Sequence, residues 1–332
     1  MEPIILMNSK WGNNSLVPLY LYFGGLTGGV FIISVLADLI GIKYKQYENI
    51  SKWTAYLVLP ILGLAGFFIM LHLGRPARGL ALWNFTNVDS SWMARGGFVV
   101  LLASIFSFAY AVLWYFGFEP KIRRIIGVIG LPFLVFMSVY TGLLLSGAMF
   151  VPLWSQQFLP TLFLNSGVLG GLAAAGLIVI LTSYFSPQGG ESGGVLRLVS
   201  ATVAVVILLE ILELFLFMSS LASDPEKIVK TGQFIAPNGS LLAYELVTKG
   251  PLALWFWLGI VGIGLTLPLI ISLVVVIFQK LIQPYFRIVA FANFALVLIG
   301  GAVLRFVIVW GGDLKAPLPF PPALSPLPGL FY

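Results

Sequence analysis

The chain has no cysteine and a single histidine among its 332 residues. Without cysteine it can form no disulfide, hold no iron–sulfur cluster through thiolates and use no thiol chemistry. One histidine also excludes a bis-histidine b-type haem, which needs two histidine ligands for each haem. We therefore expect no haem and no metal held by this chain, so a redox centre of these kinds would have to belong to another polypeptide.

Charged residues are scarce as well. They make up 9% of the chain, against 59% hydrophobic residues, whereas a soluble domain carries about 25% charged residues. This composition predicts a protein that crosses a membrane several times, with lipid replacing water as its main solvent. The net charge of +6 comes largely from basic residues in the segments between apolar runs. That pattern indicates membrane orientation rather than nucleic-acid binding.

Apolar runs long enough to cross a membrane occur eight times. A span needs about 20 apolar residues, and the expected helices cover residues 17–40, 53–73, 96–117, 125–147, 161–185, 195–218, 251–279 and 286–310. The predicted fold class is all-α integral membrane, with eight transmembrane helices arranged as two four-helix bundles. We assign residues 1–150 to the first bundle, and residues 151–332 to the second bundle and its Pro-rich tail.

An even number of spans places both termini on one side of the membrane, here called side A, opposite side B. The short linkers of side B and their flanks are rich in lysine and arginine, and the positive-inside rule gives most weight to short loops. We therefore expect side B in the cytoplasm, and the termini and long loops of side A outside the cell membrane. Long loops facing one way favour a docking platform for a partner.

Both halves of the chain open with a Gly-rich helix. The first glycine cluster spans residues 24–29 and the second spans residues 167–171. Small residues allow membrane helices to approach closely, so ordinary helix packing is the expected role of these glycines. A parallel duplication of the two halves is also open.

Four ionisable residues lie inside the predicted spans: Asp38, Glu210, Glu213 and Arg305. Each costs about 2.5–3.5 kcal/mol or more at membrane depth, so each needs a structural or functional reason. We expect Arg305 to pair with Glu210 or Glu213, which share one helix face. The pair is either a static clamp between two helices or part of a proton relay. Asp38 is expected to be solvated near a helix end and is a further relay candidate.

Polar and aromatic side chains gather at side A of the first bundle: Tyr20, Tyr22, His72, Arg75 and Tyr140. A quinone needs an apolar slot, hydrogen-bond partners for its carbonyls and a group that exchanges protons, which histidine and tyrosine can supply. We therefore predict a quinone site here, with Tyr140 and His72 contacting or protonating the ring. The alternatives are an aromatic belt for Tyr20 and Tyr22, helix capping for His72 and lipid headgroup binding for Arg75.

Six short motifs occur in a fixed order: His-Leu-Gly-Arg-Pro at 72–76, Ser-Ser-Trp-Met at 90–93, Tyr-Thr-Gly-Leu-Leu-Leu-Ser at 140–146, Val-Pro-Leu-Trp at 151–154, Leu-Pro-Thr-Leu-Phe-Leu at 159–164 and Gly-Gly-Ala-Val-Leu-Arg at 300–305. Their order and spacing over residues 17–312 resemble the NrfD/PsrC family. These proteins are the membrane subunits of polysulfide reductase and related molybdenum or iron–sulfur respiratory complexes.

The resemblance implies eight helices, no haem and a quinol site in the first bundle beside an iron–sulfur partner. It places Tyr140 where the family has a quinone-contacting tyrosine. The family often has an acidic residue at the position of His72, so the sequence departs from the pattern there.

These observations predict a haem-free membrane anchor subunit of a respiratory oxidoreductase. The protein would exchange electrons and protons between a quinone/quinol pool, such as menaquinone bound as substrate, and a ferredoxin-like iron–sulfur subunit. A catalytic subunit of the molybdopterin class is the expected further partner. The alternatives are a secondary transporter and a structural anchor that has lost its quinone site.

Overall fold

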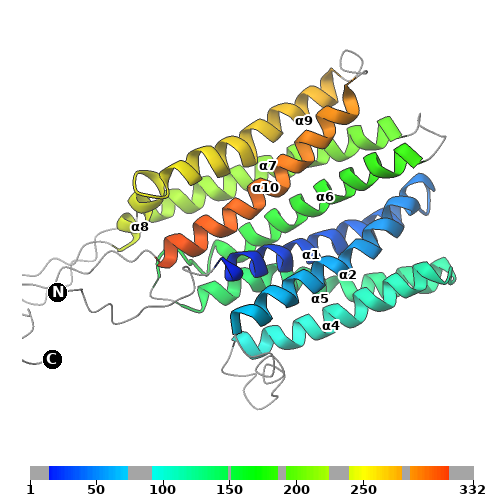
Figure 1. The fold of residues 1–332 in the computed structure, drawn as a ribbon, viewed down its shortest axis with the longest axis horizontal. Helices are drawn as coiled ribbons and strands as arrows, with labels where there is room; N and C mark the ends of the chain where they lie inside the picture. The colour runs from blue at the N-terminus through cyan, green and yellow to red at the C-terminus, as the bar shows by residue number, and fades with distance from the viewer. Residues whose placement is uncertain are drawn as a thin grey trace, which may run out of the picture.

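The computed structural model describes residues 15–73, 92–148, 151–185, 192–223, 239–278 and 285–313. Within these ranges 89% of the residues are helical and there are no strands. The helices are α1 (Leu16–Ile40), α2 (Gln46–Leu73), α4 (Trp92–Tyr115), α5 (Pro120–Ser146), α6 (Leu159–Phe185), α7 (Ser192–Ser223), α8 (Gly239–Thr248), the π-helical segment η3 (Trp255–Thr266), α9 (Leu267–Ile277) and α10 (Phe286–Asp313) (Figure 1).

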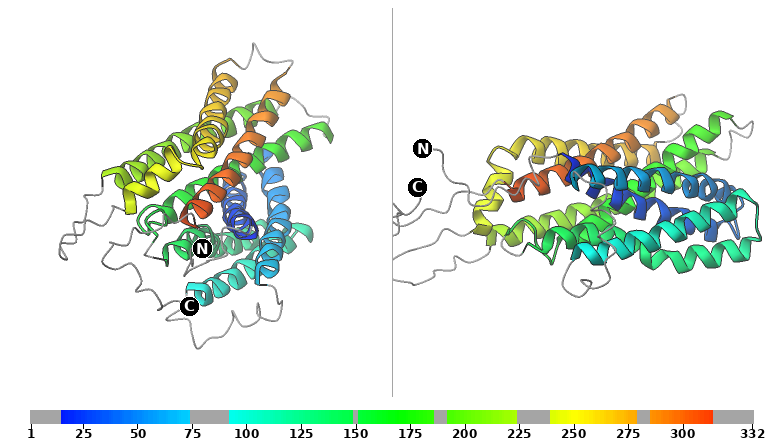
Figure 2. Two further views of the ribbon diagram at one scale, coloured as in Figure 1. Left: turned by 60° about the vertical axis from the view of Figure 1, so that its left-hand side comes forward. Right: turned by 60° about the horizontal axis from the view of Figure 1, so that its bottom comes forward.

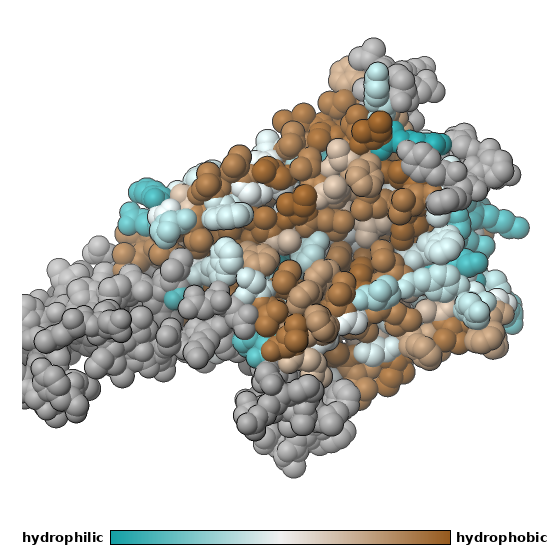
Figure 3. All heavy atoms as spheres, viewed as in Figure 1, coloured by the Kyte–Doolittle hydropathy of each residue, from teal (hydrophilic) through white to brown (hydrophobic). Residues whose placement is uncertain are grey.

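The eight predicted spans are confirmed in the described part of the protein. Eight helices there are long and apolar enough to cross a membrane, and η3 and α9 together make the seventh. They run roughly side by side, and α1 begins at the same end of the molecule at which α10 ends (Figures 1 and 2). Hydrophilic residues gather towards the two ends of the molecule, and hydrophobic residues dominate the surface between them (Figure 3). The protein is therefore a multi-pass membrane protein.

Three features of the helices differ from those expected from the sequence. Helix α2 begins at Gln46 rather than residue 53, with Glu48 in its first turn, where a carboxylate is favourable near the helix N-terminus. A search for apolar runs detects only the part of a helix that lies in lipid, so it misses this polar first turn. The short helix α8 was not predicted, and the seventh span is π-helical over its first half.

Helix neighbours follow the sequence order closely. Helices α1, α2, α4 and α5 pack against one another, as do α6, α7, η3–α9 and α10. Across the expected boundary, α1 packs against α6 and α10, and α5 packs against α6. One hydrophobic cluster joins Leu21 of α1 with Phe163 of α6 and Val309 of α10. The division into two separate bundles therefore stays a prediction, because the core is shared across it.

The contact between α1 and α6 is made by glycine. A Cβ atom added to Gly29 of α1 would overlap the carbonyl group of Gly167 on α6, and one added to Gly171 would overlap the carbonyl group of Gly29. The two backbones therefore touch directly, as small residues permit in membrane helices. The expected packing role of the two glycine clusters is confirmed, and the clusters turn out to pack against each other.

Asp38 is fully buried, so the expected solvated position is wrong. Nη2 and Nε of Arg123 donate to its two carboxylate oxygens over 2.6 and 2.8 Å. The Tyr110 hydroxyl and Nε of Arg124 donate to the same carboxylate, over 3.0 and 3.1 Å. The burial arises because α5 brings both arginines back over the end of α1. A carboxylate with this many donors supports a static clamp better than a relay.

The same cluster also includes Glu48 of α2 and a second aromatic residue of α4. Nη2 of Arg124 contacts Glu48 of α2 at 3.0 Å, and the Arg123 guanidinium lies 3.4 Å from the centre of the Trp114 ring on α4. Four helices are thus joined at side B by one group of charges and rings. Buried ion pairs of this kind are costly to break, because removing one partner leaves the other charge uncompensated.

We expect Asp38→Asn to lower the free energy of unfolding by about 3–5 kcal/mol, the cost of leaving a buried charge unpaired. The matched control is Glu245→Gln, which removes the exposed pair of Glu245 with Lys249 (3.4 Å) and should cost no more than about 0.5 kcal/mol. Denaturant unfolding of the purified protein in detergent measures both. Equal, small losses would contradict the clamp.

Candidate functional site

A cavity opens among α1, α2, α4 and α5 in the half of the molecule nearer side A. It encloses about 570 Å³ of empty space, including the part open to the surroundings. We call it the tyrosine cavity, and it is lined by Tyr20, Leu62, Ala65, Gly66, Ile69, Gly97, Val100, Met137, Tyr140 and Leu144. Two hydroxyl groups therefore lie in an otherwise apolar wall.

The two tyrosines come from different helices and meet inside the protein. Tyr20 is 8% exposed and Tyr140 is 2% exposed, and their hydroxyl groups hydrogen-bond to each other. Tyr20 lies one turn into α1, and Tyr140 lies about 9 Å from the end of α5 at 1.5 Å per residue. Both are therefore near side A but inside the helix bundle. The predicted placement of these two residues in one layer near side A agrees with the structure.

Gly96 of α4 explains how the Tyr140 ring fits. A Cβ atom added to Gly96 would overlap the ring and the hydroxyl oxygen of Tyr140. The ring thus lies directly against the α4 backbone. Sequence reasoning missed Gly96 and also Gly66, which borders the tyrosine cavity. The available signal was a glycine within an apolar span, which is too common in membrane helices to identify a site.

The remaining predicted site residues of side A lie elsewhere. His72 is in the last turn of α2, partly exposed, about one turn beyond the lining residue Ile69. The Tyr22 hydroxyl donates to the Leu298 carbonyl oxygen of α10 over 3.0 Å, so Tyr22 faces α10 and not the tyrosine cavity. Arg75 lies outside the described residues. Of the five residues, the structure brings Tyr20 and Tyr140 together.

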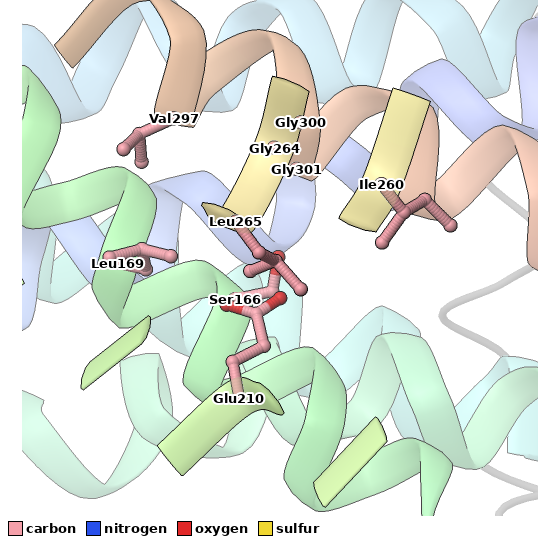
Figure 4. A pocket seen from close by; sticks show the side chains of 9 residues that line it. All are labelled: Ser166, Leu169, Glu210, Ile260, Gly264, Leu265, Val297, Gly300 and Gly301. Atoms are coloured by element: carbon pink, nitrogen blue, oxygen red, sulfur yellow. The ribbon is translucent and has the colours of Figure 1, made fainter. Parts of the chain in front are cut away.

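A second, smaller cavity lies between α6, α7, η3 and α10 (Figure 4). We call it the Glu210 cavity. It encloses about 240 Å³, including its open part, and is lined by Ser166, Leu169, Glu210, Ile260, Gly264, Leu265, Val297, Gly300 and Gly301. The Glu210 side chain points from α7 toward Ser166 of α6, and the Ser166 hydroxyl hydrogen-bonds to the Glu210 carboxyl group.

Arg305 lies close by but does not form the predicted ion pair. Its Nη2 donates to the Phe163 carbonyl oxygen over 3.0 Å, and its guanidinium lies 3.6 Å from the centre of the Phe163 ring. Within the described residues it makes no direct ion pair with Glu210 or Glu213, although the charges of Arg305 and Glu210 act on each other at longer range. The predicted direct pair is therefore wrong, because the arginine is held along α6 instead.

Glu213 takes a separate position on α7. It is a partly buried residue whose carboxyl group hydrogen-bonds to the Asn165 side chain of α6. It does not line the Glu210 cavity. The shared helix face predicted for Glu210 and Glu213 therefore does not place both carboxyl groups in one cavity.

Residues 6–316 match the family model described as "Polysulphide reductase, NrfD". The chain belongs to the NrfD family. One of the polypeptides of polysulfide reductase from Wolinella succinogenes is 26% identical to it over 92% of this sequence and 99% of that protein. Protein NrfD of Escherichia coli K12 is 27% identical over 90% and 94%. A selenate reductase subunit from Mesobacillus selenatarsenatis is 21% identical over 79% of this sequence and 66% of that protein.

The match confirms the family predicted from the ordered motifs. It extends over nearly the whole sequence, so both cavities of this NrfD-family protein fall inside the matched region. Two of the relatives are named as components of reductases, which agrees with a membrane subunit in a reductase complex.

We expect Gly96→Ala to lower the free energy of unfolding by about 1–3 kcal/mol, because the new methyl group displaces the Tyr140 ring. The same substitution should cost clearly less in a Tyr140→Ala background, where the overlapping ring is gone, giving an interaction energy of about 0.5–3 kcal/mol. Denaturant unfolding of the four proteins in detergent completes the cycle. Purely additive effects would show that Gly96 and Tyr140 do not pack together.

Proposed function

We propose that this NrfD-family protein is the quinone-reactive membrane subunit of a respiratory oxidoreductase, and that the quinone ring binds in the tyrosine cavity. The observation that carries the proposal is the pair of hydrogen-bonded tyrosines, Tyr20 and Tyr140, in an apolar cavity that is partly open. A tyrosine hydroxyl both donates and accepts hydrogen bonds. It can therefore bind the carbonyl oxygen of a quinone as well as the hydroxyl group of a quinol.

The lining also favours a neutral ligand. None of the ten described residues that line the tyrosine cavity carries a formal charge. A charged ligand would lose its hydration there without gaining a partner of opposite charge, which costs far more than burying a neutral ring. A quinone and its fully reduced quinol are both neutral, and their apolar rings match the leucine, isoleucine, valine and methionine side chains of the wall.

Helix α2 offers a route for the ligand. No heavy atom lies within 4 Å of the Cβ position at Gly66, which borders the cavity. The neighbouring Leu64 and Phe67 are exposed at 42% and 55%, on a surface that faces lipid in a membrane. Quinones are lipid-soluble, so open space beside an exposed helix suits entry of the ring from the bilayer.

The electrons need a second protein. Because the sequence has no cysteine, it cannot hold an iron–sulfur cluster through thiolates. The tyrosine cavity lies within a few turns of side A, where α2 ends and α4 begins. We infer that a ferredoxin-like iron–sulfur subunit docks there and passes electrons to or from a catalytic subunit of the molybdopterin class. In this proposal side A faces outward from the cell membrane.

Oxidation of a quinol releases its hydrogens as protons and electrons. In the proposed arrangement Tyr140 and Tyr20 hold the quinol oxygen, the electrons pass to the partner's cluster and the protons leave toward side A. His72 lies about one turn beyond Ile69 on that path, and an imidazole group can both accept and donate a proton. The reverse sequence reduces a quinone with the same groups.

We expect Tyr140→Phe to lower quinol turnover of the purified complex by about 10²-fold or more, as loss of a group that positions or transfers a proton does. Tyr22→Phe is the control, because Tyr22 lies on the same helix as Tyr20 but bonds to Leu298 of α10. Both variants should retain the partner subunits. Equal turnover in the two variants, with the complex intact, would show that the Tyr140 hydroxyl does not act on the quinol. That result would favour the alternative of a structural anchor without a quinone site.

A second prediction fills the tyrosine cavity directly. Gly66→Leu should weaken binding of a quinone analogue by at least about tenfold, equal to 1.4 kcal/mol or more, since the new side chain occupies the space beside Gly66. Gly63→Leu introduces the same residue one turn away, outside the lining, and should leave binding unchanged. Leucine favours a helix more than glycine does, so neither substitution should weaken α2 itself. Equal losses of binding in the two variants would indicate a change in the fold and not a filled cavity.

Solute uptake by vesicles containing this protein alone would favour the transporter alternative.

A further inference from the structure

Two opposite charges are buried in the second half of the chain with incomplete hydrogen bonding. Glu210 is 3% exposed and Arg305 is 2% exposed. Oε2 of Glu210 and both Nε and Nη1 of Arg305 have no hydrogen-bond partner among the described residues. Leaving such atoms unsatisfied costs about 1–3 kcal/mol each, and more for charged groups. These atoms therefore need another hydrogen-bond partner, or they stay unsatisfied because they have a function.

The Glu210 cavity supplies room for that partner. It borders Glu210 and Ser166, and its innermost part has space for on the order of one water molecule. Buried polar atoms with adjacent space are usually satisfied by ordered water. The Glu210 carboxyl group and the Ser166 hydroxyl both point into this space (Figure 4), so water bound there would have the polar partners that it needs.

The wall opposite Glu210 has an unusual backbone. Ile260, Gly264 and Leu265 belong to the π-helical segment η3. A Cβ atom added to Gly300 of α10 would overlap the Cα atom of Gly264, so η3 and α10 pack backbone to backbone beside the cavity. π-Helices are rare and occur frequently at functional sites. Helix packing alone does not require this geometry, because α1 and α6 make a similar glycine contact as regular α-helices.

The charged and titratable surroundings of Glu210 select the kind of ligand. Ser166 of α6 hydrogen-bonds to Glu210, and the charges of Arg305 on α10 and Glu213 on α7 act on it. Tyr22 of α1 is close enough to Arg305 to act on the arginine electrostatically. The described residues of η3 that line the cavity are not titratable. The described lining offers a metal cation only two oxygen-bearing side chains, Glu210 and Ser166, and the space is too small for the waters that would complete its coordination shell. A proton is the cation that needs no coordination shell.

We propose that the Glu210 cavity is a hydrated proton-binding site within the membrane, in which Glu210 takes up and releases a proton beside the fixed charge of Arg305. Uptake converts the carboxylate to a carboxylic acid by forming an O–H bond to a proton delivered by cavity water, and release reverses this step. Arg305 stays protonated and acts as a positioning charge. Asp38 is held by arginines and Glu213 lies outside the cavity, so neither belongs to the site.

Infrared difference spectroscopy of the purified full-length protein in lipid nanodiscs tests the proposal. On acidification we expect the carbonyl stretching band of a buried carboxylic acid to appear. The band should be lost in Glu210→Gln and kept in Glu213→Gln, which removes the neighbouring carboxyl group of the same helix. A difference spectrum unchanged by Glu210→Gln would overturn the proposal. Because quinone is not involved, the result is independent of the Tyr140 experiment.

The absence of cysteine allows a second test, which does not require removal of Glu210. Ser166→Cys places a thiol in the cavity, and Ser200→Cys places one at a fully buried position of α7 outside it. Hydrogen peroxide, which is neutral and little larger than water, should oxidise the first thiol at least about tenfold faster, because thiol reactivity follows access. Protection from later maleimide labelling reports the modification. Equally slow reaction at both positions would show that the cavity is dry and overturn the proposal.

Discussion

The backbone contact between α1 and α6 is the constraint on which the arrangement depends. Gly29, Gly167 and Gly171 bring the two helices together without side chains between them. Since α1 belongs to the first half of the chain and α6 to the second, this contact sets the distance between the halves. The hydrogen bond from Tyr22 of α1 to Leu298 of α10 crosses between the same two halves.

Helix α1 consequently serves as a wall shared by two different environments. On one side Tyr20 lines the tyrosine cavity with Tyr140. On the other side Tyr22 bonds to α10, and a Cβ atom added to Gly25 would lie 3.2 Å from Nη2 of Arg305. The described lining of the first environment carries no formal charge, whereas the second contains buried charge. A single helix thus separates the proposed quinone chemistry from the proposed proton site without any domain boundary between them.

Hydropathy and residue position were sufficient to predict the eight spans and the shared layer of Tyr20 and Tyr140 near side A, because both follow from depth along a helix. The direct hydrogen bond between the two tyrosines was not predicted. The rotation of each helix about its axis could not be predicted. It decides that Tyr22 faces α10, and it depends on packing between distant segments. The burial of Asp38 was missed for a related reason, because Arg123 and Arg124 come from another helix. Arg305 was expected to seek a carboxylate but bonds to the carbonyl oxygen of Phe163.

The glycine contact also bears on how such proteins can diverge. A methyl group at Gly29 would collide with the α6 backbone, so α1 and α6 can change only in step at these positions. Recombination that exchanged one half of the gene for that of a distant relative would unite helices with separate histories. A chimaera joined near residue 150 would therefore assemble only where both parents kept this groove free of side chains. The two halves must therefore match at this contact between α1 and α6.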